Sequence, residues 1–181
     1  MQQYRVLYTL IEGPDDERFV NNVVIKLLKE KYSWIQPYQY AKKSPIQICR
    51  FIRSIKGMNA DYIFFADIDL APCVTSKKER ILEKYSELEN DKIVIVRAEI
   101  ESWYLAGLDG LKQGQLRIST FNNTDRVTKE KFDEIKHPRF ASKIDFMIEI
   151  LKHYSIDIAQ NQNTSFRYFL SKHCKYQESK H

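Results

Sequence analysis

Three groups of acidic residues stand where apolar runs of the sequence end. Glu12 follows "RVLYTLI", Asp67 and Asp69 follow "YIFFA", and Glu99 and Glu101 follow "KIVIVRA". A carboxylate at the end of a buried strand is costly without a partner. Mg²⁺ and Mn²⁺ prefer oxygen ligands and can activate water or hold a phosphodiester. The pattern therefore predicts a metal site.

The spacing inside two of these groups favours shared ligation. In an extended strand end, Asp67 and Asp69 would point to one side and Ile68 to the other, and Glu99-Ile100-Glu101 repeats that pattern. In open α/β sheets, ligands bind in the crevice beyond the carboxyl ends of the strands. If the three strands are neighbours, the acids that converge there are Glu12, Asp16, Asp67, Asp69, Glu99 and Glu101.

The first acidic cluster has a second interpretation, as the start of a helix. Asp15, Asp16 and Glu17 come directly after Pro14, and acids in a first turn interact favourably with the helix dipole. We expect this role for Asp15 and Glu17. Asp16 stays open between the two interpretations, because it lies one helical turn after Glu12.

The remaining pattern predicts an α/β fold, with a mostly parallel sheet covered by helices on both faces and a C-terminal helical segment. Buried apolar runs alternate with amphipathic stretches, which is typical of this class. Residues 106–141 are weakly patterned and are expected to be loop with short helical turns. The expected strands lie near 5–12, 35–40, 61–67 and 92–99, and the expected helices near 14–32, 44–57, 76–90, 142–154 and 164–174.

Length and composition favour one domain, with a catalytic core over 1–110 and a closing loop and helices over 111–181 packed on it. The apolar runs are too short to span a membrane. The start "MQQYRVLYTL" has no signal-peptide layout, and the cysteines, 3 in number, are widely scattered. We therefore expect a cytoplasmic protein with reduced thiols and no membrane partner.

Basic residues are unevenly placed in a chain of formal charge +5 and pI near 9.0, which permits an anionic partner. On the helix expected near 44–57, Arg50, Arg53 and Lys56 lie opposite the apolar side. By default they form a solvated face, and the alternative is that they bind phosphates of a nucleic acid. Lys143 is a further candidate for such a contact.

Three short motifs resemble those of toprim domains, which occur in topoisomerases, primases, ribosomal-RNA maturation nucleases and OLD (overcoming lysogenization defect) nucleases. "IEGPDDERF" is similar to the first toprim motif and "ADIDL" to the second. "AEIESWYLA" resembles an acidic motif of OLD-type nucleases and of small stand-alone toprim-like proteins often encoded beside phage-defence genes. The resemblance covers about residues 5–106, and "SFRYFL" resembles the stand-alone group loosely.

This resemblance implies Mg²⁺- or Mn²⁺-dependent hydrolysis of phosphodiester bonds in DNA or RNA, with a role in phage defence. Glu12, Asp67 and Asp69 would be the catalytic residues, and Glu101 with Asp16 and Glu99 would complete a second metal site. No P-loop accompanies these motifs, so any ATP-driven function would need an ATPase or another defence-system partner. "DIDLAPC" lacks the Gly-Glu-x-Ile continuation of topoisomerases and primases, and those activities are not expected.

Two other functions compete with a nuclease. The chain could be a non-catalytic toprim-fold subunit that binds metal or nucleic acid within a larger complex. It could also be a nucleotide-sugar enzyme, since Asp-x-Asp coordinates metal-diphosphates in that class. The brevity of the chain and the Glu-Gly turn at Glu12 count against this last alternative.

Overall fold

The computed structural model describes residues 4–174, and the chain divides into two compact units, Met1–Ile95 and Val96–His181. The first unit contains nearly all of the sheet, and the second is helical. The boundary falls inside the last strand. The division into a catalytic core over 1–110 and a closing segment over 111–181 stays a prediction.

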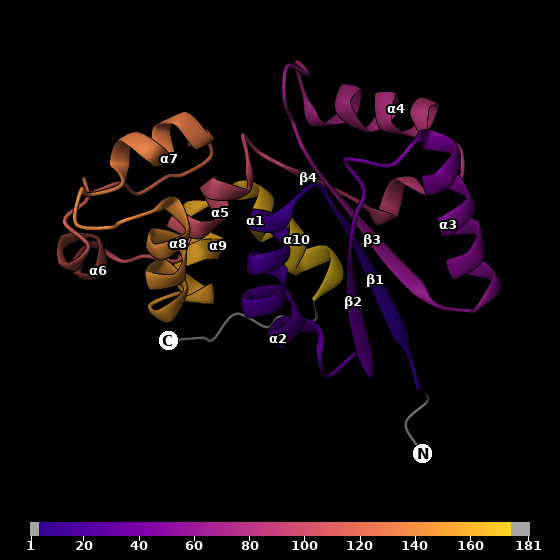
Figure 1. The fold of residues 1–181 in the computed structure, drawn as a ribbon, viewed down its shortest axis with the longest axis horizontal. Coiled ribbons are helices and arrows are strands. Elements are labelled where there is room, and N and C mark those ends of the chain that lie inside the picture. The colour runs from indigo at the N-terminus through magenta and orange to yellow at the C-terminus, as the bar shows by residue number, and fades with distance from the viewer. Residues whose placement is uncertain (1–3, 175–181) are drawn as a thin grey trace. The chain divides into compact units, whose positions relative to one another are not determined.

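A parallel sheet organises the first unit, and it has four strands within the described residues, in the order β2-β1-β3-β4 (Figure 1). Parallel pairing sets Val6 opposite Trp34, and Leu7 opposite Asp61. The central β1 is largely buried, as its apolar run predicts. The predicted α/β fold is confirmed. The strands are β1 (Val6–Ile11), β2 (Trp34–Gln39), β3 (Asp61–Asp67) and β4 (Ile93–Val96).

Helices connect the strands of the first unit. The run expected near 14–32 ends at Leu28 and contains a π-helical segment. Ser44 caps the next helix by accepting a hydrogen bond from the Gln47 backbone N–H, as the sequence predicts. The helices are α1 (Pro14–Phe19), η1 (Val20–Val24), α2 (Ile25–Leu28), α3 (Pro45–Gly57), α4 (Val74–Lys84) and the short η2 (Asn90–Lys92).

Strand alternation gives the sheet two buried faces. Leu10 and Phe64 belong to a core that includes Ile52 of α3 and Ile81 of α4. Leu7, Ile63 and Val94 are also buried but lie outside that core, on the opposite face, and Figure 1 shows α1 and α2 on the side away from α3 and α4. Both faces of the sheet are therefore covered by helices, and a functional site can form at the carboxyl ends of its strands.

The second unit packs around aromatic side chains. The Trp103 ring lies 5.0 Å from that of Phe166, and Phe132 lies 5.0 Å from Phe146. The weakly patterned stretch 106–141 contains two short helices, and the helix at Ile156–Gln162 was not among the predicted elements. The helices are α5 (Ile100–Ala106), α6 (Gly110–Gln115), α7 (Lys129–Ile135), α8 (Lys143–Lys152), α9 (Ile156–Gln162) and α10 (Thr164–His173).

Between residues 4 and 174, the helices of both units are too short or too polar to cross a bilayer.

Candidate functional site

Two of the predicted acids lie at the carboxyl edge of neighbouring strands. Glu12 is the first residue after β1, and Asp67 is the last residue of β3. These strands pair in parallel, so their ends meet at the same edge of the sheet. This edge is where the sequence predicted a site.

Tyr40 holds Glu12 at this edge. The Tyr40 hydroxyl oxygen lies 3.1 Å from Glu12 Oε1 and 2.8 Å from the carbonyl oxygen of Phe65. The tyrosine is buried, and its ring stacks on Phe64 with centroids 4.4 Å apart. Burial, and then the nearby Glu12 carboxylate, raise the pKa of Tyr40 well above its usual value. The hydroxyl therefore stays protonated at neutral pH and donates.

The expected extended geometry of Asp67-Ile68-Asp69 is wrong. β3 ends at Asp67, a turn follows in which the Ala71 N–H donates to the Ile68 carbonyl at 3.1 Å, and Asp69 has a left-handed backbone with φ of 47°. Aspartate tolerates this conformation better than most residues. The Asp69 carboxylate accepts a hydrogen bond from the Lys77 ammonium of α4.

Glu12 and Asp69 nevertheless line one cavity of about 310 Å³ within the first unit. The opposite wall is α4, which contributes residues spaced i, i+3 and i+7 on one helical face. The side chains at these three positions are cationic, which places groups that can donate to an anion beside the carboxylates. None of these cations was among the predicted site residues, although the spacing can be read from "KKERILEK". They are Lys77, Arg80 and Lys84.

Asp67 shares the edge but not the cavity. Ala66 and Ile68 line it, so strand alternation directs the Asp67 side chain away from it. Across residues 4–174, the structure arranges no group of three or more His, Cys, Asp or Glu side chains to hold a metal ion. The structure therefore brings together Glu12 and Asp69, but not the larger ligand set.

The acids of the first helix lie in its N-terminal turn. Asp16 is buried, and its Oδ2 accepts a hydrogen bond from the Gly13 N–H at 3.0 Å. Asp15 pairs with Arg18 at 2.7 Å, and Glu17 accepts from the Gln39 amide. The Asp16 contact, together with the position of all three acids in the first turn of α1, agrees with the interpretation of this cluster as a helix start.

The expected extended geometry of Glu99-Ile100-Glu101 is also wrong. β4 ends at Val96, Ala98 turns the chain with φ of 58°, and Glu99 is the N-cap residue of α5. Glu101 therefore lies in the first helical turn, where it is 5% exposed. Its Oε1 lies 2.5 Å from the Lys143 ammonium nitrogen, and Glu99 accepts a hydrogen bond from the Lys129 N–H.

A buried polar network positions α5 against α10 in the second unit. Trp103 Nε1 donates to Ser165 Oγ at 2.8 Å, and that hydroxyl donates to Asn163 Oδ1 at 2.7 Å. The Asn163 amide in turn donates to the hydroxyls of Ser102 and Thr124. "ESWYLA" and "NTSFRYFL", far apart in the sequence, are thus joined by satisfied hydrogen bonds.

The predicted nucleic-acid-binding cations have local partners. Lys143 pairs with Glu101, Arg53 pairs with Glu87 at 3.0 Å, and Lys56 pairs with Glu89 at 2.8 Å. Arg50 is exposed, and we find no ion pair for it among residues 4–174. Arg50 and Arg53 line a second cavity of the first unit, about 440 Å³, to which Lys84 also contributes. Lys84 thus borders both cavities.

Comparison with known proteins supports the fold. No protein-family model matches the chain, and no curated protein matches it. Two crystal structures of the C-terminal region of the Xanthomonas campestris pv. campestris OLD protein are similar to it, each with a TM-score of 0.50 and 15% identity. The alignments cover 95% and 93% of this chain, and 95% and 91% of the other. The C-terminal region of the Burkholderia pseudomallei OLD protein aligns with a TM-score of 0.49 and 16% identity, over 93% of this chain and 96% of that one. The chain thus shares the α/β fold of an OLD C-terminal region.

Proposed function

We propose that this protein hydrolyses phosphodiester bonds in nucleic acid with the help of a divalent metal ion. The observation that carries the proposal is the cavity at the carboxyl edge of β1 and β3, where Glu12 and Asp69 face three cations of α4. Such a cavity combines oxygen ligands for a cation with donors for a phosphate. The shared fold and the motif resemblance point to the same chemistry.

The donor set fits a Mg²⁺ or Mn²⁺ ion that keeps several of its waters. Mg²⁺ is commonly bound through one or two carboxylates plus water and substrate oxygens, and not by an all-protein cage. Glu12 and Asp69 would supply those carboxylates. A bound ion would neutralise phosphate charge and make its water a stronger acid.

The chain's own residues would orient the substrate. Lys77, Arg80 and Lys84 would hold phosphate oxygens in the cavity, and the cavity that shares Lys84 would guide the next phosphates toward Arg50 and Arg53. Tyr40 would fix the Glu12 carboxylate, which then accepts a proton or binds the ion. The exposed Asp69 would exchange Lys77 for that ion.

A second candidate is a non-catalytic subunit that binds nucleic acid. The ion pairs of Asp69 with Lys77 and of Glu101 with Lys143 favour it, because they satisfy these carboxylates without a metal. In either case the proposed cellular role is in phage defence, with an ATPase or another protein of a defence system as partner.

A cleavage assay separates the two candidates. Purified protein is incubated with single- and double-stranded DNA and RNA, with Mg²⁺, Mn²⁺ or a chelator. We expect metal-dependent products that disappear in Asp69→Ala, whose side chain lines the cavity. The control Asp15→Asn, whose side chain pairs with Arg18, should stay active. Binding of any of these nucleic acids without cleavage would select the non-catalytic function.

A further inference from the structure

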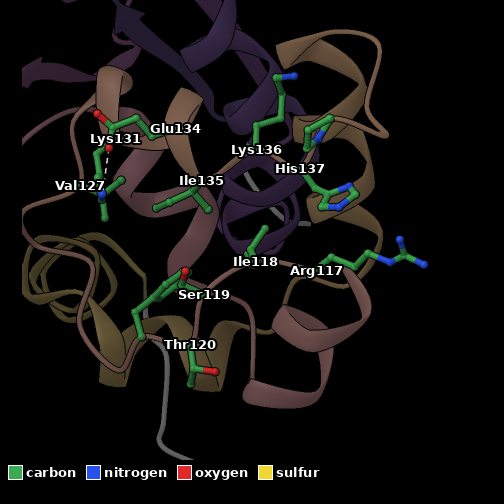
Figure 2. A pocket seen from close by; sticks show the side chains of 12 residues that line it. Arg117, Ile118, Ser119, Thr120, Val127, Lys131, Glu134, Ile135, Lys136 and His137 are labelled. Atoms are coloured by element: carbon green, nitrogen blue, oxygen red, sulfur yellow. Dashed lines mark hydrogen bonds and ion pairs between the residues drawn. The ribbon is translucent and has the colours of Figure 1, made fainter.

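A separate cavity lies wholly in the second unit, beside α7 (Figure 2). Its volume is about 560 Å³, inside the range of roughly 300–1,000 Å³ typical of small-molecule sites. The walls come from the segment after α6 and from α7 with the turn that follows it. None of the acids of the candidate catalytic site lines it.

The charge of this cavity is positive. Lys131 and Glu134 neutralise each other at 2.9 Å. Lys136 donates to the neutral carbonyl of Phe140 at 3.2 Å, so its charge is retained. For Arg117, the structure shows no ion pair within residues 4–174. An anionic group is therefore the expected ligand.

His137 adds a directed donor. Its Nδ1 accepts a hydrogen bond from the Arg139 N–H at 3.2 Å. In the neutral imidazole the proton must then reside on Nε2, which can donate to an anion. Ser119 and Thr120 add hydroxyl groups to the lining. The guanidinium and imidazole donors, which lie on the same side of the cavity in Figure 2, suit phosphate oxygens.

Apolar side chains occupy the middle of the site. Figure 2 shows Ile118 and Ile135 between the Lys131–Glu134 pair on one side and Arg117 and His137 on the other. A ligand that fills this cavity would thus contact apolar surface with one part and cations with another. Arg117 also has a left-handed backbone, with φ of 56°, and such strained residues cluster at ligand sites.

We propose that this cavity binds a nucleoside monophosphate group, with the phosphate at Arg117 and His137 and the base over Ile118 and Ile135. The group comes either from a free nucleotide or from the phosphorylated end of a nucleic-acid strand. The proposal goes beyond phosphodiester hydrolysis, because it concerns binding alone and requires no metal.

Calorimetric titration in the presence of a chelator tests this site without cleavage. The probes are AMP, adenosine, and one short single-stranded oligonucleotide with either a 5′-phosphate or a 5′-hydroxyl. We expect saturable binding of AMP and of the 5′-phosphorylated strand, and binding at least about 10-fold weaker for the probes that lack the phosphate. Tighter binding of the phosphorylated strand than of AMP identifies strand ends as the source, and the reverse order identifies free nucleotides.

Variants assign the binding to this cavity. Arg117→Gln and His137→Gln should each weaken AMP binding by about 10-fold. The exposed Arg167 of α10 does not line the cavity, so Arg167→Gln is the matched control and should bind as the unmodified protein does. Circular dichroism confirms that each variant is folded. Equal binding of AMP and adenosine, equal affinity of Arg117→Gln and the unmodified protein, or no saturable binding would overturn the proposal.

Discussion

The ends of β3 and β4 carry the same type of acidic pattern but use it differently. Both strands are followed by a non-glycine residue with a left-handed backbone, Asp69 after β3 and Ala98 after β4. After β3 the side chain of Asp69 is 62% exposed at a cavity, whereas after β4 that of Glu101 is 6% exposed in an ion pair. The segment that follows each strand explains this difference in exposure. A loop leads from β3 to α4, whereas α5 begins within four residues of β4.

This comparison separates acids available for chemistry from acids that support the fold. The Asp69 carboxylate is exposed, so a metal ion can reach it and replace its partner Lys77. A buried carboxylate that loses its partner is left uncompensated. Variants at the cavity of the first unit that contains Glu12 and Asp69 should therefore change activity, and variants at Glu101 should change stability.

The largest effect is expected at Glu12. Glu12→Gln should lower metal-dependent cleavage by roughly 10²-fold or more, because a positioned proton acceptor or ligand is lost. The metal-free melting temperature should not fall, since the amide keeps the size of the side chain and relieves carboxylate repulsion. Glu17→Gln, on a side chain that contacts Gln39, is the control and should stay active. A fully active Glu12→Gln protein would show that Glu12 has a structural role and not a catalytic one.

The buried pair of the second unit should show the opposite behaviour. Lys143→Ala leaves the Glu101 carboxylate buried without its main partner and should destabilise the fold by about 3 kcal/mol. The double variant Glu101→Gln/Lys143→Met should recover most of this loss, because no buried charge remains. Chemical denaturation measures both. If Lys143→Ala were as stable as the unmodified protein, the buried Glu101 carboxylate would not need Lys143 as its partner.

Tyr40 connects stability and activity in the first unit. Tyr40→Phe removes a buried hydroxyl that contacts both Glu12 and the Phe65 carbonyl, and should cost about 1–2 kcal/mol of stability. Cleavage should also fall, because Glu12 loses the group that orients it. Tyr38→Phe is the control on a half-buried tyrosine that stacks on Phe51. If Tyr40→Phe lost stability but kept full activity, the hydroxyl would be structural only.

The cations of α4 should determine part of the salt dependence of nucleic-acid affinity. Arg80→Gln and Lys84→Gln should each reduce the log–log slope of nucleic-acid affinity against salt by roughly 0.7–0.9. Lys78 donates to the Asn90 carbonyl and does not line the cavity, so Lys78→Gln should leave the slope unchanged. The exposed Arg50 should behave as Arg80 does if the strand continues into the adjoining cavity, and an unchanged slope would return Arg50 to the solvated face.

The smallest effect concerns the turn after β4. Ala98→Gly removes the steric strain of an alanine in a left-handed conformation, which costs about 1–2 kcal/mol. Glycine also raises the conformational entropy of the unfolded chain, which lowers stability by about 0.4–1 kcal/mol. A net gain of about 0.5 kcal/mol is expected in thermal denaturation. Ala106→Gly, in the buried α5, should instead lose stability. A loss at Ala98 as large as that at Ala106 would mean that the alanine methyl packs well enough to outweigh its strain.

Much of the fold can be predicted from the sequence because its signals are local. The apolar runs at β1 and β3, the Ser44 cap of α3 and the alternation of strands with helices specify a parallel α/β arrangement without knowledge of contacts. The same patterns locate Glu12 and Asp67 at the carboxyl edge of paired strands, because each acid directly follows or ends a buried run.

The direction and partners of the acidic side chains depend on the tertiary structure. Asp-Ile-Asp and Glu-Ile-Glu look alike in sequence, yet a turn takes one out of the strand and a helix begins inside the other. The pairing of Glu101 with Lys143 joins residues 42 positions apart, and no local pattern encodes such a contact. The sequence by itself determined which residue types stand at the strand ends. Only the packing of α4 and α8 decided which carboxylate stays exposed at a cavity and which is buried against its lysine partner, since charge pairing depends on distance in space and burial.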